Sequence, residues 1–456
     1  MIKKQHVPAD VLKQIRQDPL GKVKIAITDI DGVLRGKVIH RDKFLSIAAS
    51  GFGFCDVIFG WDSSDACYDN ATFTGWHTGY PDATAVVDLS TFRRVPWDHQ
   101  IPFFLADFRN KKGESLEICP RSLLKKIREE ASHLGFKAVF SQEFEWFNFQ
   151  ETSEELRQRN FQEPRPLTPG MFGYSILRSS KNSAFFNDLF DHLRDFGVPL
   201  EAIHTETGPG VYEAAIVYED ILEAADRATL FKTAVKEIGA RHGIIPSFMA
   251  KWNQELPGCG GHLHQSLWDS GRKKNLFYDA KETMSPLMKN YLAGILHCMP
   301  EILPFYAPTI NSYKRLVEGA WAPTTVTWAV DNRTTAVRVL TGGSPQSTRL
   351  ELRVVGSDVN PYLAMAASLA SGLYGIKNKM PLKIPPTKGS GYRDSSHGTL
   401  PRDLNEATQI MKKSKLAKEL FGETFVNHFV QTREWEWRQY SKAVTDWELK
   451  RYFEII

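Results

Sequence analysis

The stretch KAVFSQEFEWFNF, residues 137–149, has the aromatic and β-branched composition of a strand. Alternate residues of a strand share a face, so Glu143 and Glu145 point the same way, about 7 Å apart along the backbone. Phe144 and Trp146 then pack behind them. Two acidic side chains on one face repel each other unless a cation or a proton lies between them. Taken alone, the segment is also compatible with a charged, solvent-facing strand.

Three further segments repeat this pattern and favour a functional interpretation. Glu206 and Glu213 flank a Gly-Pro-Gly turn that can bring both carboxylates toward one point. His262 and His264 share one face of a predicted strand, and RLELR, residues 349–353, places a carboxylate between two cations. A strand histidine is more often a satisfied interior residue than a metal ligand, but four such strands in one chain argue against coincidence. This oxygen-rich set suits Mg²⁺ or Mn²⁺ better than zinc.

Five arginines complete the chemistry that these strands indicate: Arg315, Arg333, Arg338, Arg349 and Arg353. A guanidinium group binds phosphate or carboxylate bidentately. Arginines beside divalent metal supply the charge neutralisation that phosphoryl transfer requires. The sequence contains neither a Gly-x-x-x-x-Gly-Lys-Ser/Thr loop nor a Gly-x-Gly-x-x-Gly turn, so neither P-loop nor kinase architecture is indicated.

The composition describes a soluble globular protein with two or three domains. The 456 residues are 42% apolar and 24% charged, with a net charge of +4. The most basic segment, residues 377–388, is interpreted as solvated surface, so no nucleic-acid partner is predicted. No apolar stretch is long enough to cross a membrane, and the N-terminus lacks a signal-peptide core. The five cysteines contain no Cys-x-x-Cys pair, which predicts a reducing, cytoplasmic location.

The chain pattern predicts an α+β protein. Two β-rich runs within residues 23–40 are separated by the turn pair Asp31-Gly32, which predicts a hairpin. Residues 51–82 are crowded with Gly, Asp and aromatics and are expected to form loops. Helices are predicted over 120–135, 184–197 and 217–243 and from Asn360-Pro361 onward. The polar segment 111–120 marks the boundary between a small β-rich domain, residues 1–112, and a large domain, residues 113–456.

At this point several motifs together resemble the glutamine synthetase family. They are ITDIDGVLRGKVI (27–39), ETGPGVYE (206–213), GGHLHQSLW (260–268), NSYKRLVEGAWAP (311–323), VDNRTTAVRV (330–339) and RLELRVVGSDVNPYLAMAA (349–367). The resemblance covers nearly the whole chain. It implies a β-grasp-like N-terminal domain and a catalytic domain with a curved antiparallel sheet and flanking helices. It also implies a homo-oligomer of stacked rings, commonly a dodecamer, with active sites shared between subunits.

The resemblance assigns a role to each matching residue. Two or more divalent ions, Mg²⁺ or Mn²⁺, would be held by Glu145, Glu206 and Glu213 and by Glu143, His262 and Glu351. Arg315, Arg353 and Gly258 would hold glutamate, Arg333 would stabilise the transferring phosphoryl group, and His264, Ser266, Arg338 and Arg349 would lie along ATP. The family reaction transfers the γ-phosphate of ATP to the γ-carboxylate of glutamate, and an amine then displaces phosphate from the acyl phosphate.

Departures from the family pattern concern the second substrate. Trp321 stands where ammonia-using members carry a flap glutamate, and an indole disfavours a small hydrated cation while offering an apolar face to an organic substituent. The alternative is that Trp321 only packs the flap. Asp62 is predicted to deprotonate the amine, with Asp65 as a competing candidate. Four other departures have no clear role: Val211, Trp252, Pro257 and Gln346.

The sequence therefore predicts an ATP-dependent ligase that joins the γ-carboxylate of glutamate to a primary organic amine. Trp61, Trp76 and Trp321, with Phe59, favour an alkyl or aromatic amine over a polyamine. One rival is glutamine synthetase proper, which uses ammonia. A rival of another class is a catalytically silent structural relative that keeps only the ring assembly.

Overall fold

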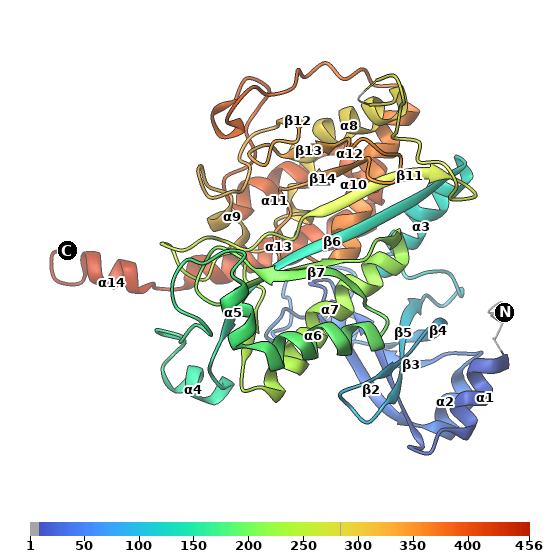
Figure 1. The fold of residues 1–456 in the computed structure, drawn as a ribbon. Coiled ribbons are helices and arrows are strands. Elements are labelled where there is room, and N and C mark those ends of the chain that lie inside the picture. The colour runs from blue at the N-terminus through green and yellow to red at the C-terminus, as the bar shows by residue number, and fades with distance from the viewer. Residues whose placement is uncertain (1–8, 283) are drawn as a thin grey trace.

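The computed structural model describes residues 9–282 and 284–456 and contains two β-sheets with helices around them (Figure 1). The smaller sheet lies near the N-terminus and has the strand order β2-β1-β5-β4-β3. Its strands are β1 (Lys22–Thr28), β2 (Leu34–His40), β3 (Phe52–Cys55), β4 (Asp82–Val95) and β5 (Ile101–Arg109). Strands β1 and β5 run parallel and the other neighbours antiparallel.

The predicted hairpin is confirmed, because β1 and β2 pair antiparallel from Lys22↔His40 to Thr28↔Leu34. Gly32 lies in their connection with φ +84°, a conformation that favours glycine. A Cβ atom on Gly32 would also meet the Cα atom of Asn360 at 2.9 Å. The turn is therefore pressed against the start of a helix in the large domain.

The expectation that residues 51–82 form only loops was wrong. Residues 52–55 form β3, which pairs with β4, and a 3₁₀ turn follows over Asp56–Phe59. Phe59 is fully buried and packs edge-to-face on Phe108 of β5, with ring centroids 5.5 Å apart. The aromatics that made this segment resemble an irregular loop supply part of the core of the small domain.

Both faces of the small sheet are buried along its central strand β5. One face, with Phe104 at its centre, packs against α1 (Ala9–Gln17) and α2 (Arg41–Ile47). The opposite face, which carries Phe103 and Leu105, belongs to the same core as the large domain. A strand covered on both sides needs apolar residues throughout, which explains the unbroken burial of residues 101–108.

The larger sheet is mainly antiparallel, with the order β12-β13-β14-β11-β6-β8-β7 (Figure 1). Its strands are β6 (Phe136–Phe149), β7 (Leu200–Thr205), β8 (Val211–Ile216), β11 (Leu263–Asp269), β12 (Trp328–Val330), β13 (Val337–Leu340) and β14 (Arg349–Leu352). Two short strands, β9 (Glu219–Asp220) and β10 (Ile245–Ser247), also pair with β6. The long strand β6 is therefore the centre of the sheet, with β11 on one side and β8 on the other.

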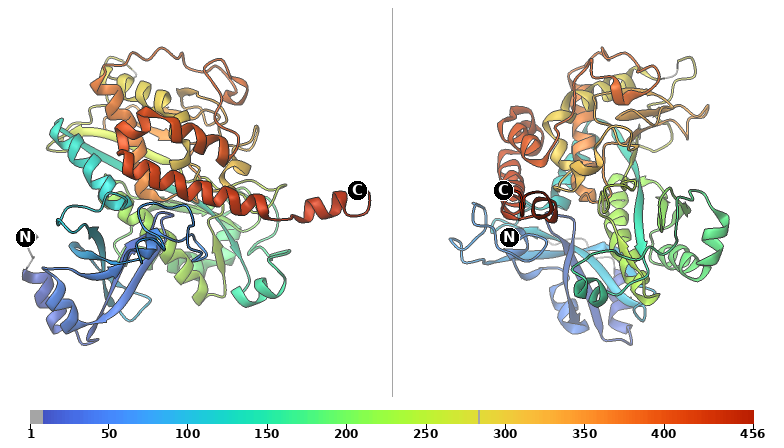
Figure 2. Two further views of the ribbon diagram at one scale, coloured as in Figure 1. Left: turned by 180° about the vertical axis from the view of Figure 1, so that it is seen from behind. Right: turned by 90° about the vertical axis from the view of Figure 1, so that its left-hand side faces the viewer.

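The helices of the large domain cover this sheet and its ends. They are α3 (Pro120–His133), α4 (Ser153–Gln158), α5 (Ile176–Lys181), α6 (Ser183–Asp195), α7 (Ile221–Arg241), α8 (Pro286–Cys298), α9 (Ser312–Arg315), α10 (Pro361–Lys377), α11 (Leu404–Lys413), α12 (Lys415–Phe421), α13 (Glu423–Lys442) and α14 (Asp446–Tyr452). Helix α14 projects away from the body, as Figure 1 and, from behind, Figure 2 show. Among the residues that the structure describes, no helix has the length and apolarity to span a bilayer.

The predicted helices are present, with one shifted boundary. Helix α3 ends just before Gly135, and α10 begins after Asn360, whose side chain accepts a hydrogen bond from the Tyr362 amide. Helix α7 begins at Ile221 rather than at residue 217, because Asp220 caps it and pairs with β6. The proposed domain boundary at residues 112 and 113 lies in the connection between β5 and α3.

A buried ionic cluster ties the two domains together. Arg121 on α3 donates hydrogen bonds to Asp88 and Asp107 of the small sheet and to Asp226 on α7, at 2.8–3.1 Å. Arg121 is 2% exposed. Lys125, one turn further along α3, contacts both Asp88 and Asp107. Each acid is paired, so burial of these charges is tolerated. Losing the central arginine would leave Asp226 without a cationic partner, and Asp88 and Asp107 would share Lys125 alone.

We predict that Arg121→Met lowers the stability of the folded chain strongly. Removal of one partner from a buried ion cluster costs about 3–5 kcal/mol. Urea unfolding followed by tryptophan fluorescence measures this loss. Arg194→Met is the matched control, because Arg194 pairs with Asp191 on the surface and its loss should leave the midpoint nearly unchanged. Equal midpoints for the two variants would contradict the assigned role of the cluster.

The same cluster predicts sensitivity to acid. Burial opposes ionisation of Asp88 and Asp107, but Arg121 and Lys125 outweigh it and hold both pKa values below the ordinary 3.8. Depressed carboxyl pKa values stabilise the fold above pH 3.8, and this contribution falls as the pH drops below that value. Unfolding free energies measured from pH 6 to pH 3 should decrease more steeply for the parent protein than for Asp88→Asn.

Candidate active site

The two faces of β6 separate the core from the site. Phe144 and Trp146 are fully buried, as the alternation predicted. Phe144 stacks on Phe231 of α7 at 5.5 Å, and the Trp146 ring meets the same phenylalanine edge-on. Glu143 and Glu145 occupy alternate positions of this strand and line a cavity on its other side. The aromatic layer therefore fixes the strand from which both carboxylates project.

Strand register assembles a first group of ligands around Glu351 on β14. Its cross-strand partners are His264 on β11 and Arg338 on β13. Directly opposed residues have Cβ atoms about 5 Å apart, so these side chains meet. His264 Nε2 lies 3.2 Å from the Glu143 carboxylate, and one ligand atom each of Glu143, His264 and Glu351 lies within 4.8 Å of the others.

His262, the predicted ligand, lies beside this group. Its Nδ1 atom is 3.7 Å from Glu143 and 3.5 Å from Glu351. Burial, with the charge of Arg353, lowers the pKa of His262, which keeps its imidazole in the neutral form that binds metal. Both imidazoles of the His-Leu-His motif are thus near the Glu143 and Glu351 carboxylates. The three ligand atoms that lie within 4.8 Å of one another include His264 and not His262.

Neighbouring cations compensate the charges of this first group. Arg338 donates a 2.9 Å hydrogen bond to Glu351, and Arg353 also contacts this carboxylate. Burial opposes the Glu351 charge, but Arg353 and His264 outweigh it and lower the pKa of Glu351 to about 2. Burial also opposes the charge of Glu143, but interactions with His264 and His262 outweigh it and hold the pKa of Glu143 well below its usual range. Both carboxylates are therefore ionised at neutral pH.

A second group forms where β6, β8 and β7 run side by side. Glu213 on β8 lies opposite Glu145 on one side and opposite His204 on the other. Glu206 follows directly after β7, and ligand atoms of His204, Glu206 and Glu213 lie within 4.8 Å of one another. Burial, together with the charges of Glu145, Glu143 and Glu206, raises the pKa of Glu213 to about 9. This group carries more negative charge than its protein surroundings neutralise.

Sequence reasoning did not identify His204. It precedes Glu206 by two residues, the spacing that places Glu143 and Glu145 on one face, so the signal was present in the strand pattern. Glu145, which the family resemblance groups with Glu206 and Glu213, has one carboxylate oxygen already engaged. That oxygen accepts a 2.7 Å hydrogen bond from the Gly260 amide.

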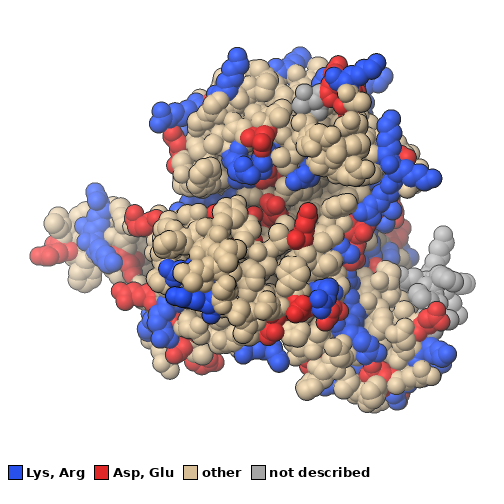
Figure 3. All heavy atoms as spheres, viewed as in Figure 1, with Lys and Arg blue, Asp and Glu red and all other residues tan. Residues whose placement is uncertain are grey.

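All members of the two groups except His264 line one cavity of about 620 Å³. Its walls consist of Glu143, Glu145, Tyr174, His204, Glu206, Thr207, Glu213, His262, Trp321, Arg333, Arg338, Glu351 and Arg353. Figure 3 shows acidic and basic side chains close together in a hollow of this face of the molecule. Carboxylates, imidazoles and arginines around one cavity can bind divalent cations and an anionic substrate together.

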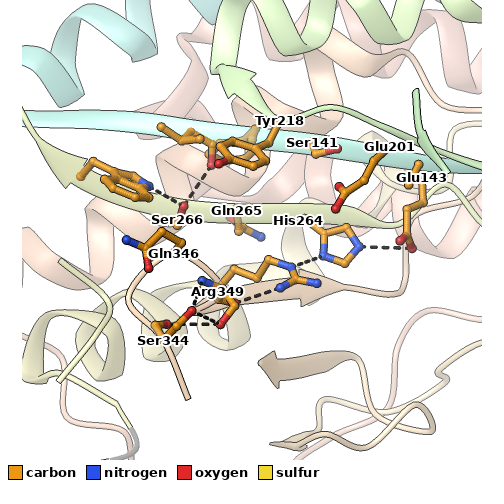
Figure 4. Close-up of a pocket in the computed structure, with 15 residues that line it drawn as sticks. Ser141, Glu143, Glu201, Tyr218, His264, Gln265, Ser266, Ser344, Gln346 and Arg349 are labelled. Atoms are coloured by element: carbon orange, nitrogen blue, oxygen red, sulfur yellow. Dashed lines mark hydrogen bonds and ion pairs between the residues drawn. The ribbon is translucent and has the colours of Figure 1, made fainter. Parts of the chain in front are cut away.

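A second pocket of about 270 Å³ adjoins the first at Glu143 (Figure 4). It is lined by Val139, Phe140, Ser141, Glu143, Glu201, Ala215, Tyr218, His264, Gln265, Ser266, Trp268, Ser344, Gln346, Ser347 and Arg349. Arg349 donates a 3.0 Å hydrogen bond to His264 Nδ1, whose other ring nitrogen faces Glu143. Of the four residues expected along the nucleotide, three line this pocket. Arg338 instead lines the cavity and contacts Glu351.

Two residues expected at glutamate lie behind the cavity wall. Arg315 is 3% exposed and donates to the main-chain oxygens of Arg353 and Val354 at 3.1 Å. A Cβ atom on Gly258 would meet the Arg315 side chain at 2.8 Å, so this glycine permits the close approach. Arg315 thereby supports the backbone of Arg353, which does line the cavity.

The residues expected to receive the amine are dispersed in this single chain. Asp62 does not line the cavity; it accepts a 2.9 Å hydrogen bond from the Trp435 indole of α13. Asp65, the competing candidate, pairs with Arg35 at 2.8 Å. Phe59 is part of the small-domain core, and the exposed Trp76 packs edge-on against Tyr80.

Trp321 is the aromatic residue that reaches the cavity from the flap segment. Its backbone has φ +57°, unusual for a residue with a side chain, and the residue is 62% exposed. Its indole therefore lies at the edge of the cavity with room for a ligand beside it. Among the other departures, Gln346 lines the second pocket, while Val211 and Trp252 belong to a small hydrophobic cluster with Phe147 and Phe149. No contact explains Pro257.

Comparison with known proteins adds independent information. Residues 117–452 match the glutamine synthetase catalytic domain. The type-1 glutamine synthetase 2 of Dictyostelium discoideum is 55% identical over 451 residues, which are 98% of this chain and 86% of that protein. A glutamate–isopropylamine ligase of Pseudomonas sp is 38% identical over 446 residues, 97% of each chain.

The gamma-glutamylethanolamide synthetase of Streptomyces coelicolor is 35% identical, over 95% of this chain and 92% of that protein. The solved structure of a GmaS–ADP complex superposes with a TM-score of 0.84 and 26% identity, covering 98% of this chain and 100% of that chain. The fold, the carboxylates carried by the strands and the sequence comparisons all indicate the same family. The chain belongs to the glutamine synthetase family of ligases.

Proposed function

We propose that this protein is an ATP-dependent ligase that forms a γ-glutamyl amide from glutamate and a primary organic amine. The observation that carries the proposal is that Glu143 forms a wall of both pockets. A nucleotide in the smaller pocket would direct its terminal phosphate toward the carboxylate groups of the larger one. Phosphoryl transfer needs this juxtaposition of a phosphate, divalent cations and an acceptor.

The residues around the cavity fit distinct roles in this chemistry. Glu143, His262 and Glu351, with His264 close by, would hold one Mg²⁺ or Mn²⁺ ion, and Glu145, Glu206 and Glu213 would hold another. Such ions would neutralise charge on the transferring phosphoryl group. Arg353 would bind a glutamate carboxylate, supported from behind by Arg315 and Gly258. Arg333 is exposed at the cavity and would contact the phosphoryl group.

The choice of an organic amine rests on Trp321. An indole at the cavity edge carries no negative charge to attract ammonium and presents an apolar surface to an alkyl or aromatic group. Two relatives, one named for the amine isopropylamine and one for a gamma-glutamylethanolamide product, support an organic amine. The favoured substrate is a small primary amine with an apolar substituent.

Ammonia is the second candidate substrate, and a specific observation favours it. The relative with 55% identity over 98% of this chain is named a glutamine synthetase. A catalytically silent relative is disfavoured, because a non-catalytic scaffold has no physical need to keep mutually repelling carboxylates buried beside one cavity.

The position of Asp62 bears on assembly. We propose that the chain forms stacked rings, commonly a dodecamer, in which Asp62 deprotonates the amine in the site of an adjacent subunit. This arrangement accounts for a predicted base that lies outside the cavity of its own chain.

The amine specificity is tested with Trp321→Glu. Phosphate release with glutamate and ATP should be faster with small alkylamines than with ammonium for the parent protein. The variant should shift the ratio of kcat/KM values toward ammonium, because a carboxylate at this edge attracts the small cation. Trp447→Glu, which changes an exposed tryptophan on α14 outside both pockets, should leave the ratio unchanged. A parent preference for ammonium would establish the glutamine synthetase alternative instead.

Metal binding is tested with Glu351→Gln. Removing this charge leaves Arg338, Arg353 and the two imidazoles without their common acidic partner, so cation binding at this group should be lost. Calorimetric titration with Mn²⁺ should show one site fewer per chain, and turnover should fall by at least about 100-fold. Asp331→Asn is the control, since this exposed acid pairs with Arg338 from outside the cavity. Unchanged stoichiometry in Glu351→Gln would contradict the assigned role of this carboxylate.

A further inference from the structure

A cavity of about 660 Å³ lies at the junction of the two domains. The turn residues Asp31, Gly32 and Val33, together with Ser63, line it from the small domain, whereas α7, β10 and α13 line it from the large domain. We call this cavity the junction pocket. Of the described residues, none that lines it also lines either pocket of the active site. The junction pocket is therefore separate from the groups that carry the proposed ligase chemistry.

Most of the lining of the junction pocket is apolar. It includes Phe149, Leu156, Ile245, Phe248 and Trp252. The Trp252 indole packs edge-on against Phe149, with ring centroids 5.0 Å apart, which fixes this part of the wall. Cavities of this size that combine apolar walls with a few polar groups are typical of small-molecule sites.

Two lysines of α7 supply positive charge to the junction pocket. Lys232 and Lys236 are four residues apart, so they share one face of the helix, and both line the cavity. Each Nζ atom lies 5.8 Å from the centroid of the same Phe248 ring. Lys232 Nζ also donates a 2.9 Å hydrogen bond to the main-chain oxygen of Val359. Two like charges are thus brought close to one aromatic ring.

Within residues 9–282 and 284–456, neither of these ammonium groups forms an ion pair with a carboxylate. Burial, together with the charge of Lys236, lowers the pKa of Lys232 to about 7. Lys236 keeps exposed surface, but the protein around its ammonium group displaces water and lowers its pKa as well. An anion placed beside both lysines would supply the charge compensation that the chain does not.

The acidic residues of the junction pocket have other partners or resist ionisation. Asp31 accepts a 2.5 Å hydrogen bond from Arg433. Asp358 accepts hydrogen bonds from two hydroxyl groups, at 2.5 and 2.7 Å. Burial raises the pKa of Glu436, which favours its neutral form. The two lysines are therefore the charged groups of this wall that an added ligand would complement.

We propose that the junction pocket binds an organic monocarboxylate with an apolar body, and that Lys232 and Lys236 contact its carboxylate. Charge-assisted hydrogen bonds from the two ammonium groups would hold the carboxylate, while the aromatic and aliphatic walls cover the apolar body. A phosphate dianion fits less well, because Asp31 and Asp358 in the same wall would repel its second charge. The inference does not depend on the ligase chemistry.

The first test is calorimetric titration of the full-length protein with 3-phenylpropionate and octanoate, each compared with its uncharged primary amide. Each acid should bind once per chain and at least about tenfold more tightly than its amide, which cannot form charge-assisted hydrogen bonds. Titrations are repeated with saturating L-glutamate, which should leave this binding in place. Failure of both acids to bind, equal affinities for acid and amide, or displacement by glutamate would overturn the proposal.

The second test assigns the binding to the two lysines. Lys236→Met keeps an apolar stem but removes the charge, and it should weaken 3-phenylpropionate by at least about tenfold. Lys236→Arg should retain most of the affinity. Lys413→Met changes an exposed lysine at the end of α11, outside the junction pocket, and should bind like the parent.

Unchanged affinity in both Lys236→Met and Lys232→Met would overturn the assignment. Phosphate release with glutamate, ATP and an amine, measured on the same preparations, keeps the two proposals apart. A parent protein that binds the acids in the predicted way without ligase turnover would contradict the proposed function and leave the junction pocket standing. Ligase turnover without carboxylate binding would do the reverse.

Discussion

Carboxylates placed opposite one another on adjacent strands repel, and the centre of this protein is arranged around that repulsion. In the first group the chain supplies its own compensation, because Arg338 and Arg353 contact Glu351 and His264 faces Glu143. In the second group compensation is incomplete, and the raised pKa of Glu213 reflects it. A cation placed among these carboxylates would reduce their mutual repulsion. The excess negative charge at this position is thus a property of strand register rather than of any single residue.

The geometry of these groups depends on the helix behind the sheet. Helix α7 presents Phe231 to the aromatic face of β6 and, one and a half turns earlier, Asp226 to the buried Arg121. One element therefore both supports the strand that carries the site carboxylates and anchors the small domain. Because Arg121 also binds Asp88 and Asp107, the N-terminal sheet is held in a fixed position relative to the catalytic sheet.

Local sequence pattern was sufficient for the faces of β6, the first hairpin and the ends of α3 and α10, since each depends on neighbours in the chain. Pairing between distant strands is not encoded locally, so the opposition of His204 and Glu213 could not be derived from spacing. The loop prediction for residues 51–82 failed because tertiary packing of Phe59 outweighed an unfavourable composition. Asp62 could be named from a motif, but its distance from the cavity of its own chain could not.

The alternation along β6 has an evolutionary consequence. One residue inserted before Ser141 would turn Phe144 and Trp146 into the cavity and drive Glu143 and Glu145 against Phe231. The insertion would therefore remove the carboxylates from the cavity and disrupt the packing of the core at the same time. Insertions and deletions among descendants of this chain should accumulate in the connections between strands, while the length of β6 stays constant even where substrate preference diverges.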